Sequence, residues 1–349
     1  MPVPTIRARV PLRLGLAGGG TDLSPYCDDH GGAVLNTTID RYAYAFIEPS
    51  DDGMVHFIAP DLDRTEAFPA DLESLKAASL ILHAGVARRM LTQYGGGHVP
   101  PMRVTSYVDA PPGSGLGSSS ALVVALVEAF AAFLSAPLGP YDVAHLAFEI
   151  ERIDLRLAGG KQDQYAATFG GTNFIEFQAR DRVIVNPLRI PVAVLNELET
   201  SLVICFTGVS RRSEDIIVEQ QRRMLAPSGD AVENLHQLKA DALEMKEALL
   251  RGEIPRMARI LNRSWEAKKR TADGISTGLI EALYACAFAQ GAIGGKVSGA
   301  GGGGFMMFVV PPNRHIPVIR ALNERGATAS GVHLTRMGAE SWSVRSEPV

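Results

Sequence analysis

A glycine- and serine-rich segment at residues 111–121 constrains the fold of this chain more than any other stretch. It reads PPGSGLGSSSA and lies between an alternating apolar run, 102–108, and a helix-length run with a single charge, 122–130. A strand, a glycine-rich turn and a helix in this order direct several backbone N–H groups at one point, where the helix N-terminus adds partial positive charge. Serine hydroxyls there can bind phosphate oxygens or Mg²⁺. The segment therefore predicts a loop that binds a polyphosphate.

Other interpretations of this segment fit its flanks less well. A glycine–serine stretch is often a flexible linker, but a linker does not usually separate a strand pattern from a helix that is apolar almost all round. The two commonest nucleotide loops are excluded, because no lysine follows the glycines and because Ser118 stands where the dinucleotide fingerprint needs glycine. We therefore assign nucleotide contacts to Pro112, Gly113, Ser114, Gly115, Leu116, Gly117, Ser118, Ser119 and Ser120.

Composition limits the classes of protein to which the chain can belong. Its 349 residues, 46% hydrophobic and 21% charged, are typical of a globular protein long enough for two domains. A net charge of −4 argues against nucleic acid or an anionic membrane as partner. Three cysteines far apart in the sequence argue against a disulfide framework or a zinc site. Because neither a signal peptide nor an apolar run of transmembrane length occurs, we expect a cytoplasmic protein.

The order of expected elements indicates an α+β fold in two domains. In the first half we expect strands at 6–16, 41–48, 54–58, 102–108 and 172–177. The expected helices there are 72–94, 119–135 and 142–157, the last with Asp142 as N-cap. After a proline-bounded transition at 188–200, we expect strands at 201–206, 305–310 and 332–336 and helices at 213–225, 231–250, 254–270, 276–290 and 314–325. We place the domain boundary near 190, between domains of residues 1–190 and 191–349.

Two acidic residues beyond the loop are candidates for the chemistry of phosphoryl transfer. This reaction needs metal ligands, a cation near the moving group and a residue that orients or deprotonates the attacking hydroxyl. A hydroxyl and a carboxylate suit Mg²⁺, so Ser119 and Glu151 form a candidate pair. Asp163, in a glycine-rich turn beside Lys161, can accept a proton. Each acid also has a plainer interpretation, Glu151 as a solvated helix residue and Asp163 as a capping residue.

Two further glycine-rich segments are candidates for ligand contacts. Residues 18–22, which follow Arg13, offer backbone amides, a hydroxyl and a carboxylate that suit a polyhydroxylated ligand, although a plain turn is an alternative. Residues 299–304 match the dinucleotide fingerprint only as a string, because a strand pattern and not a helix follows them. Their glycines still indicate a close approach of the backbone to another group. The candidate substrate contacts are Gly18, Gly19, Gly20, Thr21, Asp22, Gly301 and Gly302.

These segments, in this order, resemble the GHMP kinases, a family named for galacto-, homoserine, mevalonate and phosphomevalonate kinase. The first motif is at 9–22, the phosphate loop at 111–121 has Ser120 in place of an alanine, and the third motif is at 296–305. The resemblance spans essentially the whole chain. It implies the two-domain α+β fold of that family, with a mixed-sheet N-terminal domain that carries the phosphate loop and a ferredoxin-like C-terminal domain.

The same resemblance implies cofactors and residue roles. ATP and Mg²⁺ are the expected cofactors, with Ser119 and Glu151 as metal ligands. Asp163 is the expected base or orienting group, and Arg13 is expected near the acceptor. The spacing from Glu151 to Asp163 is one residue longer than in mevalonate kinases. We expect no nucleic-acid or membrane partner and leave a homodimer open.

Within the family, residues 17–22, 159–165 and 206–211 resemble the bacterial heptose 7-phosphate kinases. The resemblance implies an ATP-dependent kinase that phosphorylates the anomeric hydroxyl of D-glycero-D-manno-heptose 7-phosphate, in the synthesis of activated heptose for lipopolysaccharide or capsule. The first-motif signature of galactokinases is absent. A kinase for fucose, a mannose-like sugar or a uronic acid stays an alternative, as does a non-enzymatic sensor of ATP and sugar. For the phosphate of such an acceptor, the candidate cations are Lys161, Arg211, Arg212 and Lys268, and Lys161 and Arg211 are preferred.

Overall fold

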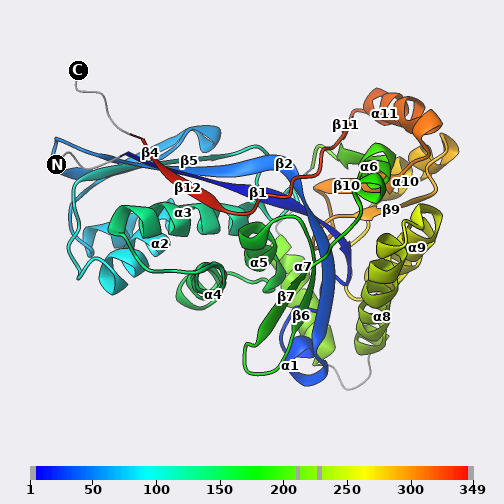
Figure 1. Cartoon of the computed structure of the whole chain (residues 1–349), viewed down its shortest axis with the longest axis horizontal. Coiled ribbons are helices and arrows are strands. Elements are labelled where there is room, and N and C mark those ends of the chain that lie inside the picture. Colours follow the sequence, from blue (N-terminus) through cyan, green and yellow to red (C-terminus); the bar gives the residue numbers. More distant parts are fainter. Residues whose placement is uncertain (1–4, 210–212, 226–229, 345–349) are drawn as a thin grey trace.

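The computed structural model of the chain describes residues 5–209, 213–225 and 230–344 and contains a large and a small β-sheet (Figure 1). The large sheet has eight strands. They are β1 (Thr5–Ala17), β2 (Gly32–Pro49), β3 (Met54–Ala59), β4 (Arg64–Pro69), β5 (Met102–Val108), β6 (Thr172–Phe177), β7 (Val183–Pro187) and β12 (Glu340–Val344). The order is β12-β1-β2-β5-β3-β4, with β6 pairing β2 and β7. Among the described strands of this sheet, only β3 and β5 pair in parallel, so the sheet is mixed.

Helices cover one face of the large sheet, as Figure 1 shows for α2, α3, α4 and α5. Their bounds are α1 (Tyr26–His30), α2 (Ile81–Gln93), α3 (Ser118–Leu134), α4 (Pro140–Phe148) and α5 (Gln162–Phe169), with short 3₁₀ turns at Pro60–Leu62 and Ser74–Ala77. The α3 helix packs against β1 and β2 and is buried almost all round, which explains its apolar sequence. The loop before α3 therefore has a rigid base.

The small sheet is antiparallel, with strand order β11-β8-β10-β9. Its strands are β8 (Leu202–Phe206), β9 (Gly294–Val297), β10 (Phe305–Val309) and β11 (Thr328–Gly331). The helices of this half are α6 (Val192–Ser201), α7 (Ser213–Met224), α8 (Asp230–Leu250), α9 (Ile254–Lys269), α10 (Gly278–Ala289) and α11 (His315–Glu324), with a 3₁₀ turn at Pro312–Arg314. None of the described helices combines the length and the apolar composition that crossing a bilayer requires.

The two halves of the chain are interlocked. The chain leaves the small sheet after β11, and its last strand, β12, pairs antiparallel with β1 at the edge of the large sheet (Figure 1). The α8 helix also packs against β1 and β2. The mixed sheet and the α+β class that the sequence predicts are confirmed, whereas a division between 190 and 191 stays a prediction.

Some expected elements differ from those observed. The helix expected at 142–157 is α4 followed by a π-helical turn, Glu149–Asp154, and Asp142 lies within the first turn, where its carboxylate accepts the Gly139 N–H (2.9 Å). The transition at 188–200 contains most of helix α6, and Pro191 is its N-cap, a position at which the missing N–H breaks no intrahelical hydrogen bond. The strand expected at 332–336 is wrong, since that stretch forms only an isolated bridge between Leu334 and Ile39.

Candidate active site

The predicted phosphate loop forms a concave backbone surface at the start of α3. Gly113, Gly115 and Gly117 all have left-handed backbones, with φ of 71°, 76° and 75°. Alternation of left- and right-handed residues turns successive N–H groups toward one side, which makes an anion-binding concavity. Ser114 and Leu116 are fully buried and anchor the loop from below. The other seven predicted residues line a hollow, the loop hollow, namely Pro112, Gly113, Gly115, Gly117, Ser118, Ser119 and Ser120.

Glu151 is not a solvated helix residue, because its side chain is 1% exposed beneath the loop hollow. Its Oε1 accepts a hydrogen bond from the Ser119 hydroxyl (2.7 Å). Its Oε2 accepts from the Ser120 hydroxyl and from Gln164 Nε2, each at 2.7 Å. The Arg152 guanidinium lies 3.4 Å from Oε1. The Ser119 hydroxyl and Glu151 Oε1 are thus adjacent hard oxygen donors, which fit Mg²⁺ chemically.

Glu151 belongs to the π-helical turn Glu149–Asp154. The Leu155 N–H donates to the Ile150 carbonyl, five residues earlier, at 3.0 Å. Such a turn holds one residue more than an α-helical turn and is frequent at functional sites. Glu151 lies within this turn, and its carboxylate faces the Ser119 hydroxyl.

Arg13 and Asp163 form an ion pair directly beside the loop. Nε of Arg13 donates to Oδ1 of Asp163 at 2.7 Å, and NH1 donates to the Gly115 carbonyl at 2.6 Å. Arg13 is 3% exposed, in β1, and Asp163 lies in the first turn of α5. A Cβ on Gly117 would lie 3.3 Å from Asp163 Cγ and 3.4 Å from Arg13 Cγ. Glycine at this position therefore lets the loop close over the pair.

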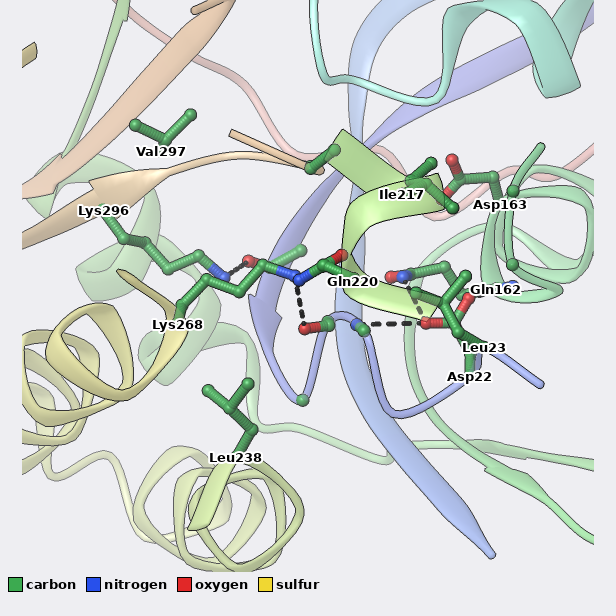
Figure 2. Close-up of a pocket in the computed structure, with 18 of the residues that line it drawn as sticks. Asp22, Leu23, Gln162, Asp163, Ile217, Gln220, Leu238, Lys268, Lys296 and Val297 are labelled. Carbon is green, nitrogen blue, oxygen red and sulfur yellow. Dashed lines mark hydrogen bonds between the residues drawn. The ribbon is translucent and has the colours of Figure 1, made fainter. Parts of the chain in front are cut away.

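A second hollow, the inner hollow (Figure 2), shares Arg13 and Asp163 with the loop hollow as lining residues. It is lined by Arg13, Gly18, Gly19, Gly20, Asp22, Asp163, Lys268 and Lys296, among others. The Asp22 carboxylate accepts from the Gly20 N–H (3.2 Å) and from the backbone and side-chain N–H groups of Gln162 (3.1 and 2.9 Å). Burial raises the pKa of Asp22, and the nearby Asp163 carboxylate raises it further. Arg13 and Asp163 stand where the two hollows meet.

Thr21 supports the loop at 18–22 and does not line either hollow. Its hydroxyl lies 2.8 Å from the Gly18 carbonyl and accepts the Ala33 N–H at 3.1 Å. A Cβ on Gly18 would lie 2.0 Å from the Ala33 carbonyl oxygen, so this position requires glycine for packing. The segment is thus a built loop and not a plain hairpin turn, with Thr21 as an internal brace.

The C-terminal glycines approach the phosphate loop itself. The Phe305 N–H donates to the Ser114 carbonyl (2.7 Å), and the Ser298 hydroxyl donates to the Gly115 carbonyl (2.9 Å). Gly301 and Gly302 pack against Ile275 and line neither hollow. The residues of this segment that do line both hollows are Gly299 and Ala300.

Of the two preferred basic residues, Lys161 belongs to the described part of the chain, and it does not line the inner hollow. The Lys161 ammonium donates to Asp181 Oδ1 at 2.5 Å and lies 3.6 Å from Asp28, in a neighbouring hollow. Arg211 and Arg212 lie outside the described residues. Lys268, a less favoured candidate, does line the inner hollow.

Sequence reasoning missed Lys296 and Trp265, which also line the inner hollow. In the sequence, Lys296 is the first residue of the third motif, 296–305, and carries no assigned role there. It is the single charged residue between two glycines, 294–295, and the glycine-rich segment that leads to an apolar strand. Lysine is seldom buried in such a segment unless an anion pairs with it, which is the feature that could have marked it. Burial lowers the pKa of Lys296 to about 7 and that of Lys268 to about 8.

Comparison with known proteins identifies the family. The model of the GHMP kinases N terminal domain matches residues 80–171, and that of the GHMP kinases C terminal region matches residues 245–328. The chain is 42% identical over 342 residues to the D-glycero-alpha-D-manno-heptose 7-phosphate kinase of Campylobacter jejuni, covering 97% of this chain and 99% of that protein. The chain belongs to the GHMP kinase family. The family and the fold that the sequence predicts are thereby confirmed.

Two other proteins bear on the specificity of this GHMP kinase. A solved structure of a D-glycero-D-manno-heptose 1-phosphate kinase from Bacteroides thetaiotaomicron is 41% identical and superposes with a TM-score of 0.83, covering 98% of this chain and 100% of that one. The L-fucokinase/L-fucose-1-P guanylyltransferase of Bacteroides fragilis is 27% identical over 345 residues, and the match covers 90% of this chain and 36% of that protein.

Proposed function

We propose that this GHMP kinase transfers the γ-phosphoryl group of ATP to the anomeric hydroxyl of D-glycero-D-manno-heptose 7-phosphate. The observation that carries the proposal is the Arg13–Asp163 pair, which lines both hollows at the point where they meet. The identity of 41–42% to proteins named as heptose phosphate kinases supports the sugar. The product, a heptose 1,7-bisphosphate, would supply activated heptose for surface polysaccharide.

The loop hollow is the proposed site for the phosphates of ATP. Backbone N–H groups at Gly113–Ser119 and the N-terminus of α3 would hold the β- and γ-phosphates. Ser119 and Glu151 Oε1 would hold Mg²⁺, which when bound would offset negative charge on the phosphates. Since the described residues contain no group of three or more His, Cys, Asp or Glu side chains arranged to hold a metal ion, phosphate oxygens and water would complete the coordination.

Asp163 and Arg13 are the proposed catalytic residues. Oδ2 of Asp163 is the oxygen for which no donor is found among the described residues, so it is free to accept a hydrogen bond or the proton of the anomeric hydroxyl. The Arg13 guanidinium, beside the Gly115 carbonyl of the loop, would lie near the transferring group and stabilise its negative charge. Gly19, Gly20 and Asp22 line the inner hollow and would contact sugar hydroxyls.

An ATP-consumption assay across a sugar panel tests the proposal. The panel contains mannoheptose, its 7-phosphate, its 1-phosphate, mannose, mannose 6-phosphate, fucose and galactose, and phosphorus NMR identifies the position that is phosphorylated. We expect turnover to be fastest with mannoheptose 7-phosphate and to produce an anomeric phosphate. Fastest turnover with fucose, the sugar in the name of the 27% identical relative, would replace the heptose assignment. ATP binding without turnover of any sugar would favour a sensor.

A further inference from the structure

We propose that Lys268 and Lys296, with the indole N–H of Trp265, bind the phosphate group that the acceptor already carries. This inference rests on the proposed function, in which the acceptor is a sugar phosphate. It replaces the sequence-based preference for Lys161, and it makes the inner hollow the part of the molecule that selects a phosphorylated sugar over a free one.

Both lysine side chains reach into the inner hollow, from helix α9 and from strand β9, and Figure 2 shows them on one side of it with Asp163 on the other. Nζ of Lys268 donates to the Gly19 carbonyl at 3.2 Å, and Nζ of Lys296 donates to the Gly15 carbonyl at 2.7 Å. Within the described part of the chain, neither ammonium forms an ion pair. Each lysine thus has donors left for a ligand.

The charge balance of this site calls for an anion. Removing an ammonium from water without a counter-charge is costly, and the cost is met by a paired charge or by loss of the proton. Burial lowers the pKa of Lys268 to about 8, although the Asp22 carboxylate partly opposes this. The pKa of Lys296 falls to about 7 because of burial, with Lys268 and Arg13 adding repulsion. A phosphate dianion would supply both the missing charge and the missing acceptors.

Trp265 provides an independent observation. It lines the inner hollow, is 1% exposed, and its Nε1 has no hydrogen-bond partner among the described residues. Buried N–H donors are nearly always paired in native proteins, because an unpaired donor loses its hydration without compensation. Trp265 lines the same hollow as Lys268 and Lys296, and an unpaired N–H donor in a hollow with two ammonium groups that lack a counter-charge fits an oxygen-rich anion. It does not fit a hollow meant for an apolar group.

The neighbouring hollow that contains Lys161 is a weaker site for a phosphate. Lys161 is already bonded to Asp181, and Arg152 donates to the Gly160 carbonyl (3.3 Å) and lies 3.4 Å from Glu151. Their charges and donors are therefore largely used within the protein. In addition, the Arg13–Asp163 pair lines the inner hollow and not this neighbour. An anion site in the inner hollow shares that hollow with Asp163, so one sugar phosphate can contact both.

The first test compares two acceptors that differ only in the phosphate. For Lys268→Met and Lys296→Met, we expect kcat/KM with mannoheptose 7-phosphate to fall roughly 10- to 100-fold, the usual effect of losing a hydrogen bond to a charged group. With unphosphorylated mannoheptose, kcat/KM should stay within about threefold of wild type. The matched control is Lys76→Met, which removes the same charge from a surface lysine paired with Glu73. Lys296→Gln serves as a second variant, and circular dichroism checks that each variant folds.

Two outcomes of this test would overturn the inference. An equal fall with both acceptors would assign the lysines to the phosphoryl group that is transferred and not to the acceptor's own phosphate. A selective loss of mannoheptose 7-phosphate turnover in Lys161→Met, with Lys268→Met and Lys296→Met unaffected, would place the anion site in the neighbouring hollow.

A binding measurement separates this inference from the proposed function. The chain has two tryptophans, and the other, Trp342, is 41% exposed in β12, so Trp342→Phe leaves Trp265 as the only one. Mannoheptose 7-phosphate, mannose 6-phosphate and mannoheptose are titrated while its emission is recorded. If the sugar phosphates change the Trp265 emission only in protein that retains both Lys268 and Lys296, the proposed anion site is supported, even if the enzyme turns over no heptose. If mannoheptose 7-phosphate is turned over but replacing either lysine leaves its affinity unchanged, the proposed function is supported and this inference is wrong.

Discussion

Arg13 and Asp163 lie 150 positions apart in the sequence, yet Nε of Arg13 donates a 2.7 Å hydrogen bond to Oδ1 of Asp163 beside Gly117. The contact joins strand β1 to the first turn of α5. Because the same arginine also donates to the Gly115 carbonyl, the pair is tied to the phosphate loop. It thereby holds an acid, a cation and the loop in one geometry, which phosphoryl transfer requires.

Asp163→Asn tests whether Asp163 accepts the proton of the attacking hydroxyl. The amide keeps an oxygen for Arg13 but accepts no proton at neutral pH, so we expect kcat to fall roughly 10²- to 10⁴-fold. The affinities for ATP and sugar phosphate should change only a few-fold. Single-turnover kinetics measures the chemical step, and calorimetry measures both affinities. Near-normal turnover by a variant that binds both ligands would show that Asp163 is not the base.

Ser119→Ala tests the metal–nucleotide contact. The substitution removes the hydroxyl that contacts Glu151 Oε1 at the edge of the loop hollow. We expect the KM for MgATP to rise roughly tenfold, in line with the loss of one hydrogen bond or weak ligand. Sugar-phosphate binding, measured without nucleotide, is the internal control and should not change. An unchanged KM for MgATP together with weaker sugar binding would contradict the assignment.

Gly115→Ala tests the packing of the C-terminal glycine segment on the phosphate loop. Gly115 has φ of 76°, and a Cβ there would lie 2.3 Å from the Ser298 carbonyl oxygen. Gly274 has the same φ of 76° but nothing within 4 Å, so Gly274→Ala isolates the backbone cost, about 1 kcal/mol. We expect Gly115→Ala to reduce the free energy of unfolding by about 2 kcal/mol more than Gly274→Ala does, and to weaken ATP binding. If urea denaturation gives the same loss of unfolding free energy for both variants, the backbone at Ser298 moves aside at little cost and the prediction is wrong.

Lys296→Met has a pH signature in stability. The pKa of Lys296 is about 7 in the folded protein against an ordinary value of 10.5, so between these values the unfolded chain binds a proton that the folded chain does not. The free energy of unfolding therefore increases as the pH rises through this window, because the energetic cost of burying Lys296 decreases. We expect Lys296→Met to raise the melting temperature without ligand, by more at about pH 6 than at about pH 9. Calorimetry of both proteins across this range measures the difference, and a gain that grows with pH would contradict it.

Sequence patterns located most elements because the signals for them are local. The glycine-rich turn between a strand pattern and an apolar helix is observed as the loop between β5 and α3. Local patterns misled where tertiary contacts decide the outcome. Most of the stretch at 188–200 belongs to α6, Val192–Ser201, which begins directly after Pro191. Residues 328–344 divide into β11 and β12 because each of these strands pairs with a different sheet.

The candidate site divides in the same way. The family, the α+β fold and the residue types for phosphoryl transfer follow from short motifs, since a backbone concavity and an acid in a turn depend on neighbours in the chain. The tertiary structure alone decided that Lys296 and Lys268, from β9 and α9, share the inner hollow and that Lys161 faces Asp181. Whether a lysine is available to a ligand depends on burial and on the charges around it. These charges come from segments far apart in the sequence, and only folding brings them together.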